Sequence, residues 1–96
     1  MQRDAILNTL KQHHADIKAR YAVRSIALFG SVARNEDRPE SDIDILVAFD
    51  GPATSDRYFG VQFYLEDLLH RRIDLVTDKA LRPEFRPYIE REAIYV

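Results

Sequence analysis

From Leu28 to Val47 the chain reads LFGSVARNEDRPESDIDILV, in which a Gly-Ser pair follows one hydrophobic run and two aspartates stand within a second. The side chains of a strand alternate between its two faces, so Asp42 and Asp44 are expected to project from the same side of the second run. Two carboxylates at roughly 5 Å repel each other by about 1 to 4 kcal/mol, depending on the effective dielectric constant. A divalent cation between them would remove that cost, so the pair is a candidate metal site.

Composition restricts the kinds of protein that this chain can be. The 96 residues are 46% hydrophobic and 31% charged, which predicts a single soluble domain over residues 1–96. The formal net charge of −2 lacks the basic excess of a dedicated nucleic-acid binder, so direct nucleic-acid binding is not expected. There is no cysteine, and no apolar run approaches the ~20 residues of a membrane span. We therefore expect a cytoplasmic protein with no membrane partner.

The spacing of hydrophobic residues predicts helices that alternate with strands. Helices are expected over 4–21, with Asp4 as the cap, from Ser31 into the polar stretch 35–40, over 57–70 and from Pro83 onward. Strands are expected at 24–29, where both faces are covered, at 42–49, at 73–77 and, as a short terminal strand, at 93–96. This alternation predicts an α/β domain in which helices flank a small mixed or parallel sheet.

The two later helices carry aromatic residues whose placement the spacing leaves open. In the helix over 57–70, we expect Phe59 and Phe63 to lie in the core, with a partner-binding stripe as the alternative. In the last helix, the first turn tolerates proline, so both Pro83 and Pro87 are expected there. Tyr88 and Ile89 are expected to form its buried face.

The aspartates suit nucleotidyl transfer, a reaction that needs charge neutralised at the attacking and leaving oxygens more than it needs covalent help. Two Mg²⁺ ions about 3.5 to 4 Å apart provide that neutralisation, and aspartate oxygens are suitable ligands for them. Asp42 and Asp44 would bridge or share the two ions. Asp74 lies on the next expected strand and can come alongside as a third carboxylate. There it would hold the metal that activates an incoming hydroxyl, and it could accept the hydroxyl proton.

The Gly-Ser pair suits the phosphate half of a nucleotide. A glycine at a strand-to-helix turn, here Gly30, lets a phosphate approach the backbone, and the following helix presents free N–H groups. Ser31 would add a hydroxyl donor. Arg34, one turn further on, could reach an anionic oxygen or could pair with an acidic residue of the stretch 36–40.

Each of these features also has an ordinary structural explanation. The Gly-Ser pair can be only a turn and a cap, and the aspartate pair can cap a turn and remain exposed. Asp74 can lie at an exposed edge or pair with Arg71 or Arg72. Their order and spacing, taken together, favour a site.

Four segments resemble the minimal nucleotidyltransferases of the DNA polymerase beta superfamily: Gly30-Ser31, Ala33-Arg34, Ser41-Asp42-Ile43-Asp44 and Ile73-Asp74-Leu75. The match is strongest over 26–47, and the order of elements extends it over nearly the whole chain. The resemblance implies the nucleotidyltransferase fold, ATP as substrate and Mg²⁺ as cofactor. One departure is Asn35, which stands where the family often has glycine; since asparagine tolerates left-handed geometry, we expect the turn to survive.

In its short length the chain resembles the antitoxin-like branch of that superfamily. Members of this branch are commonly paired with a HEPN-domain ribonuclease toxin. The resemblance implies that the chain transfers AMP from ATP to a tyrosine of such a toxin within a hetero-oligomeric complex. It implies Asp42, Asp44 and Asp74 as metal ligands, with Gly30 and Ser31 holding the triphosphate. Two alternatives remain: a non-catalytic antitoxin that neutralises its partner by binding alone, and nucleotidyl transfer to a small molecule or RNA.

Overall fold

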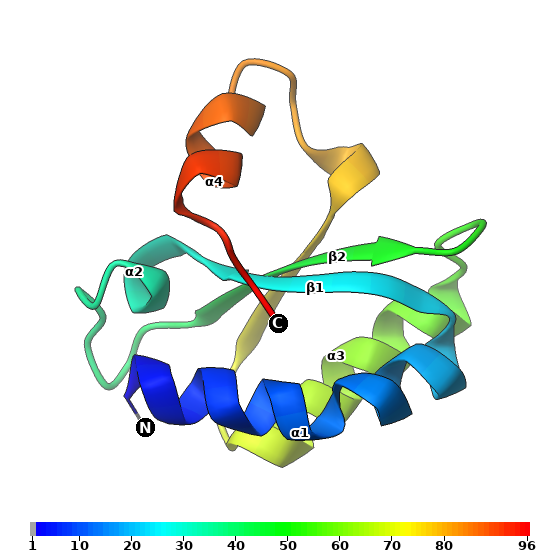
Figure 1. The fold of residues 1–96 in the computed structure, drawn as a ribbon, viewed down its shortest axis with the longest axis horizontal. Helices are drawn as coiled ribbons and strands as arrows, with labels where there is room; N and C mark the ends of the chain where they lie inside the picture. The colour runs from blue at the N-terminus through cyan, green and yellow to red at the C-terminus, as the bar shows by residue number, and fades with distance from the viewer. Residues whose placement is uncertain (1) are drawn as a thin grey trace.

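The computed structural model describes residues 2–96 as a four-stranded sheet with helices on both faces (Figure 1). The elements are α1 (Arg3–Tyr21), β1 (Val23–Phe29), α2 (Gly30–Ala33), β2 (Ile43–Phe49), α3 (Ser55–Leu69), β3 (Ile73–Thr77), the 3₁₀ helix η1 (Asp78–Ala80), α4 (Arg86–Glu92) and β4 (Ile94–Tyr95). The strand order is β3-β2-β1-β4. β1 pairs antiparallel with β2 and β4, whereas β2 pairs parallel with β3. The expected arrangement of helices around the sheet is confirmed, and the sheet is mixed.

Hydrophobic side chains cover both faces of the central strands. On one face, α1 and α3 pack against the sheet over Ile26, Leu28, Ile43 and Ile45, all fully buried. On the other face, α4 and the segment before it lie over the sheet (Figure 1), and a smaller cluster of buried side chains forms there. Its buried residues are Ala27, Phe29, Leu46 and Leu81. This two-sided burial explains why the run over β1 is apolar with little alternation, as expected for a strand covered on both faces.

The sheet register brings the ends of three strands together. β1 runs antiparallel to β2, so its last residue, Phe29, faces Asp44 near the start of β2. Because β3 is parallel to β2, its second residue, Asp74, faces Asp44 from the other side. The turn into α2 therefore lies beside the start of β2, at the same end of the sheet as the start of β3.

The helix α3 begins two residues earlier than expected and presents a different face. Thr54 caps it, because its side-chain oxygen accepts a hydrogen bond from the N–H of Arg57 at 3.3 Å. Phe59 and Phe63, which we expected in the core, are 49% and 60% exposed. Val61 points into the core, and a residue two positions away lies about 200° around the helix, so Phe59 and Phe63 face outward. They stack on each other, with ring centroids 6.3 Å apart.

The helix α4 begins at Arg86 and not at Pro83. Pro87 lies in its first turn as expected, but Pro83 lies outside it. A helix begun at Pro83 would need the N–H of residue 87 for its next hydrogen bond, and proline has none. Tyr88 is 68% exposed, so its expected burial is wrong, whereas Ile89 packs against the smaller cluster.

Smaller differences concern the other boundaries. Gln2, and not Asp4, is the N-cap of α1; Asp4 lies in the first turn, where its charge favours the helix dipole. β2 begins one residue after Asp42, and the short terminal strand pairs with β1 as β4. Among residues 2–96, no helix is long and apolar enough to cross a membrane.

The two helices on the larger core are held together through a small residue. A Cβ atom at Gly60 of α3 would lie 2.8 Å from Cδ1 of Tyr21 in α1 and closer still to Cε1. The Tyr64 hydroxyl of α3 also donates a hydrogen bond to Asp16 of α1 at 2.7 Å. The close approach of α1 and α3 therefore depends on the absence of a side chain at Gly60.

We expect Gly60→Ala to lower the free energy of unfolding by about 1 kcal/mol, because an overpacking cost of about 1–3 kcal/mol exceeds the helix-propensity gain of about 1 kcal/mol. Urea denaturation measures this change. In a Tyr21→Ala background the clash is absent, and the same substitution should become stabilising. An equal loss in both backgrounds would show that the Tyr21 contact is not the cause.

Candidate functional site

Two of the three predicted carboxylates lie together at one end of the sheet. Asp44 of β2 and Asp74 of β3 are partners in the parallel register. Ile43 and Ile45 point into the larger core, so alternation places Asp44 on the opposite face, which is the face of α4. Asp74 is exposed and Asp44 is half-buried, so both carboxylates can be reached from solvent.

The surroundings of Asp44 disfavour its charged form. Burial, a hydrogen bond with Asp74 and the negative charges of Asp74 and Asp42 raise the pKa of Asp44 from its ordinary 3.8 to about 6, while Arg34 opposes the rise. A carboxylate with such a pKa is destabilised when it ionises without a cation beside it. The site therefore favours either a proton or a metal ion at Asp44.

Asp42 lies next to this pair but turns toward another residue. Its Oδ1 accepts a hydrogen bond from Nε of Arg72 at 3.2 Å, in an ion pair whose side chains are 40% and 84% exposed. Arg71 pairs with Asp37 at 3.3 Å and donates to the carbonyl of Ser41 at 2.6 Å. The arginines suggested as partners of Asp74 thus bind elsewhere.

Gly30 lies directly against the side chain of Asp44. Its φ is +73°, which favours glycine, and a Cβ atom there would lie 2.7 Å from Cγ of Asp44 and would overlap Oδ2. Its N–H donates a hydrogen bond to Oε1 of Glu92 at 3.0 Å. The predicted glycine turn and the predicted carboxylates are therefore in direct contact: Gly30 lies against Asp44, and its N–H binds Glu92.

The residues that follow Gly30 form α2 and the turn after it. Ser31 is half-buried in α2, and Arg34 ends that helix. Arg34 pairs with Glu36 at 3.1 Å, which agrees with the expected pairing to an acidic residue of the stretch 36–40. It also pairs with Glu92 at 2.9 Å. Asn35 has a φ of +61°, which confirms the left-handed turn expected there.

Glu92 is the functional candidate that the sequence reasoning missed. It reaches Gly30 across 62 positions of the chain and Arg34 across 58. No local spacing indicates such a contact. Only its position at the end of α4, just before β4 pairs with β1, brings it to the turn.

The donor set fits a divalent cation, although its members are not gathered around one point. Among residues 2–96, no three His, Asp or Glu side chains lie close enough to hold a metal ion as they stand. Asp44 and Asp74 supply adjacent hard oxygen ligands. A cation bound beside Asp44 would lower its raised pKa again. Asp42 could join them if it left its exposed pair with Arg72, which is a weak interaction.

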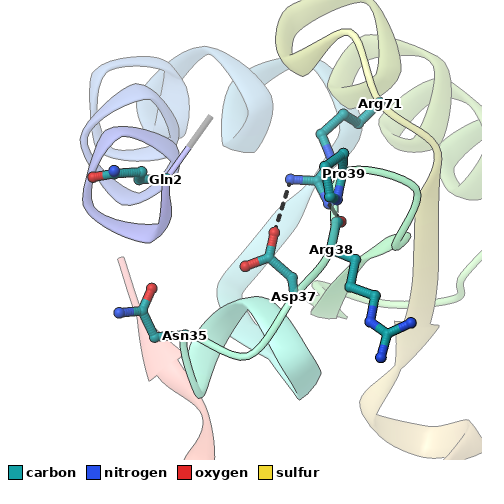
Figure 2. Close-up of a pocket in the computed structure, with 6 residues that line it drawn as sticks. All are labelled: Gln2, Asn35, Asp37, Arg38, Pro39 and Arg71. Carbon is teal, nitrogen blue, oxygen red and sulfur yellow. Dashed lines mark hydrogen bonds and ion pairs between the residues drawn. The ribbon is translucent and has the colours of Figure 1, made fainter.

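A hollow of about 350 Å³ lies between the start of α1 and the loop after α2. Figure 2 shows Asp37 turned toward Arg71 there, with the side chain of Arg38 pointing away from that pair. The lining residues are Gln2, Asn35, Asp37, Arg38, Pro39 and Arg71. None of the six residues predicted for the site lines the hollow, so we place the chemistry at the carboxylates and not here.

Comparison with known proteins gives a consistent result. The family model described as nucleotidyltransferase domain matches residues 10–96. A candidate protein adenylyltransferase of Methanocaldococcus jannaschii is 44% identical over 95% of this chain and 94% of its own length. The protein adenylyltransferase MntA of Thermococcus cleftensis is 36% identical over 97% of this chain and 94% of its own length.

Solved structures show the same fold. A candidate minimal nucleotidyltransferase is 36% identical, with a TM-score of 0.83 over 98% of this chain and 95% of that chain. A chain of the complex between tri-AMPylated HEPN toxin and MNT antitoxin of Shewanella oneidensis has a TM-score of 0.68 over 98% of this chain and 71% of that chain. Its identity is 18%, so this likeness concerns the fold alone.

The raised pKa of Asp44 predicts a specific pH dependence of stability. With a pKa of about 6 when folded and 3.8 when unfolded, the folded protein binds the proton more tightly. In a metal-free buffer the free energy of unfolding should therefore fall as the pH rises from about 4 to about 6. Asp44→Asn should flatten this slope and stabilise the protein by about 1 kcal/mol at neutral pH, a value reduced for solvent screening. Urea denaturation across this pH range measures both; an unchanged slope would contradict the assignment.

Gly30→Ala should lower the free energy of unfolding by about 2 kcal/mol or more, because left-handed strain adds to the clash with Asp44. Gly51→Ala is the matched control, since Gly51 has a φ of +86° and its nearest neighbour would lie 3.7 Å away. The control should show the strain alone, about 1 kcal/mol. Thermal denaturation compares the two, and equal losses would show that Asp44 does not press on Gly30.

Proposed function

The chain belongs to the nucleotidyltransferase domain family and is a nucleotidyltransferase, and we propose that it acts as an antitoxin that transfers AMP from ATP to a tyrosine of a cognate HEPN ribonuclease toxin. The observation that carries the proposal is the junction of Gly30, Asp44 and Asp74 at one end of the sheet. A phosphate-compatible turn lies there in contact with a carboxylate pair. The transfer would inactivate the toxin.

Relatives support the choice of nucleotide and acceptor. A relative that is 36% identical over 97% of this chain is named a protein adenylyltransferase. The Shewanella oneidensis complex of the same fold contains a toxin that carries AMP. A further structure of this fold, at 19% identity, is described as a toxin-antitoxin with AMP-PNP, an ATP analogue. We therefore infer ATP as the substrate and a HEPN toxin as the acceptor.

The residues divide between the two halves of the nucleotide. Gly30, Ser31 and Arg34 would bind the triphosphate through a backbone N–H, a hydroxyl and a guanidinium. Asp44 and Asp74, joined by Asp42, would hold two Mg²⁺ ions. When bound, Mg²⁺ would neutralise charge on the phosphate oxygens and on the attacking oxygen.

The transfer itself exchanges one bond to phosphorus for another. The tyrosine oxygen forms a bond to the α-phosphorus while the bond from that phosphorus to the pyrophosphate oxygen breaks, and pyrophosphate leaves. Asp74 is exposed at the start of β3, where an incoming hydroxyl can reach it, so we assign it as the acceptor of the hydroxyl proton.

One observation favours a second function, neutralisation by binding alone. Phe59 and Phe63 form an exposed aromatic stack on α3, a kind of surface that often contacts other proteins. Protection by such contact would need neither ATP nor the aspartates. The same experiment separates the two functions.

The decisive measurement is the intact mass of the cognate HEPN toxin after incubation with this protein, ATP and Mg²⁺. We expect a gain of one or more AMP units. The double variant Asp42→Asn and Asp44→Asn should give none, because the carboxylates that hold the metal are lost. Asp50→Asn is the matched control, since Asp50 is exposed and follows the opposite end of β2. It should transfer as well as the unaltered protein.

Two results would reject the enzymatic proposal. Full transfer by the double variant would remove the aspartates from the mechanism. Absence of any mass gain, with toxicity still suppressed by both proteins, would establish neutralisation by binding. Transfer to RNA or a small molecule by the purified chain alone would instead identify a different acceptor.

A further inference from the structure

Glu92 is held at the site from both sides along the chain. It is the last residue of α4, and the next N–H, that of Ala93, donates to the carbonyl of Ile89 at 2.9 Å. Two residues later, Ile94 pairs with Leu28 in the sheet. The α4–β4 connection thus delivers a carboxylate to the start of α2.

Each carboxylate oxygen of Glu92 accepts a hydrogen bond from one donor beside Asp44. Oε1 accepts from the N–H of Gly30 at 3.0 Å, and Oε2 accepts from Nη1 of Arg34 at 2.9 Å. The Glu92 side chain is only 26% exposed. A backbone N–H and a guanidinium that converge on one anion are also the donors that a phosphate group uses.

These donors are the ones that the proposed function gives to the triphosphate. Gly30 has a single N–H, which cannot serve the carboxylate and a phosphate oxygen at full strength. A triphosphate beside Glu92 would also place like charges in contact. Glu92 and the nucleotide therefore compete for the same two donors.

We propose that Glu92 is an internal competitor of the nucleotide: it occupies Gly30 and Arg34 in the free protein and leaves them when the triphosphate binds. The inference rests on the proposed function. The α4–β4 connection would then regulate the nucleotide site. The fraction of molecules in which Glu92 is bound to Gly30 and Arg34 would set the apparent affinity for ATP.

The elements around Glu92 allow the side chain to leave. Helix α4 has seven residues, and none of them is buried. Strand β4 has two residues, and its pairing with β1 uses backbone groups that do not involve the Glu92 carboxylate. The side chain can therefore turn away while the sheet stays paired.

The alternative role for Glu92 is a fixed positioning residue that holds Gly30 and Arg34 throughout the reaction. The two roles predict opposite effects on binding. If Glu92 competes, its removal strengthens ATP binding; if it positions the donors, its removal weakens ATP binding. The near-isosteric variant Glu92→Gln keeps the shape and removes the charge, so it distinguishes them.

The test is calorimetric titration of the free protein with ATP in Mg²⁺, without toxin. We expect Glu92→Gln to lower the Kd for ATP by about tenfold, because a charge-assisted contact no longer has to break. Glu90→Gln is the matched control: it removes one charge from the same helix, where Glu90 pairs with Arg86 at 3.4 Å. Its Kd should stay within about twofold of the unaltered protein.

A second measurement examines the contact without nucleotide. Amide hydrogen exchange at Gly30, followed by NMR, should accelerate about tenfold in Glu92→Ala and stay unchanged in Glu90→Ala. An equal or higher Kd for Glu92→Gln, or unchanged exchange at Gly30, overturns the inference. If the unaltered protein and both glutamine variants fail to bind ATP at all, the proposed function fails and the competition fails with it. If they bind ATP but Glu92→Gln gives no tightening, only the inference is rejected.

Discussion

The alignment of three strand ends is the constraint on which the rest of the structure depends. Phe29, Asp44 and Asp74 stand side by side because β1 is antiparallel and β3 parallel to β2. A slip of one residue in β2 would turn Asp44 into the larger core and move Ile43 and its neighbours to the face of α4. The hydrophobic face that stabilises the sheet therefore also fixes the position of the carboxylates. Stability and site geometry come from the same register.

The site holds several carboxylates close together beside a glycine. Asp44 is half-buried beside Asp74 and Asp42, which raises its pKa, and Gly30 is small enough to lie against it. Glu92 accepts a hydrogen bond from the Gly30 N–H. The protein thus holds two carboxylates against one glycine. Such an arrangement suits a cation at Asp44 and an exchangeable anion at the Gly30 N–H.

Sequence reasoning predicted which residues meet at the glycine turn, and its main errors lie in the helices α3 and α4, where they have separate physical causes. Gly30, Asp44 and Asp74 are brought together as expected, and the left-handed turn at Asn35 is confirmed. The burial predicted for Phe59 and Phe63 was wrong because Val61 and Leu65 form the face of α3 that packs on the core, and the two phenylalanines lie on its other side. The late start of α4 follows from the missing N–H of Pro87, which rules out a helix begun four residues earlier.

The sequence by itself determined the features that depend on near neighbours: the order of elements, the two-residue spacing of the aspartates, and the glycine turn before α2. These follow from backbone periodicity and steric preference, which act over a few residues. Only the tertiary structure decided that Asp42 pairs with Arg72 and that Glu92 reaches Gly30 across 62 positions. Such contacts depend on how the whole sheet and its helices pack, because side chains far apart in the chain meet only after every intervening element has taken its place.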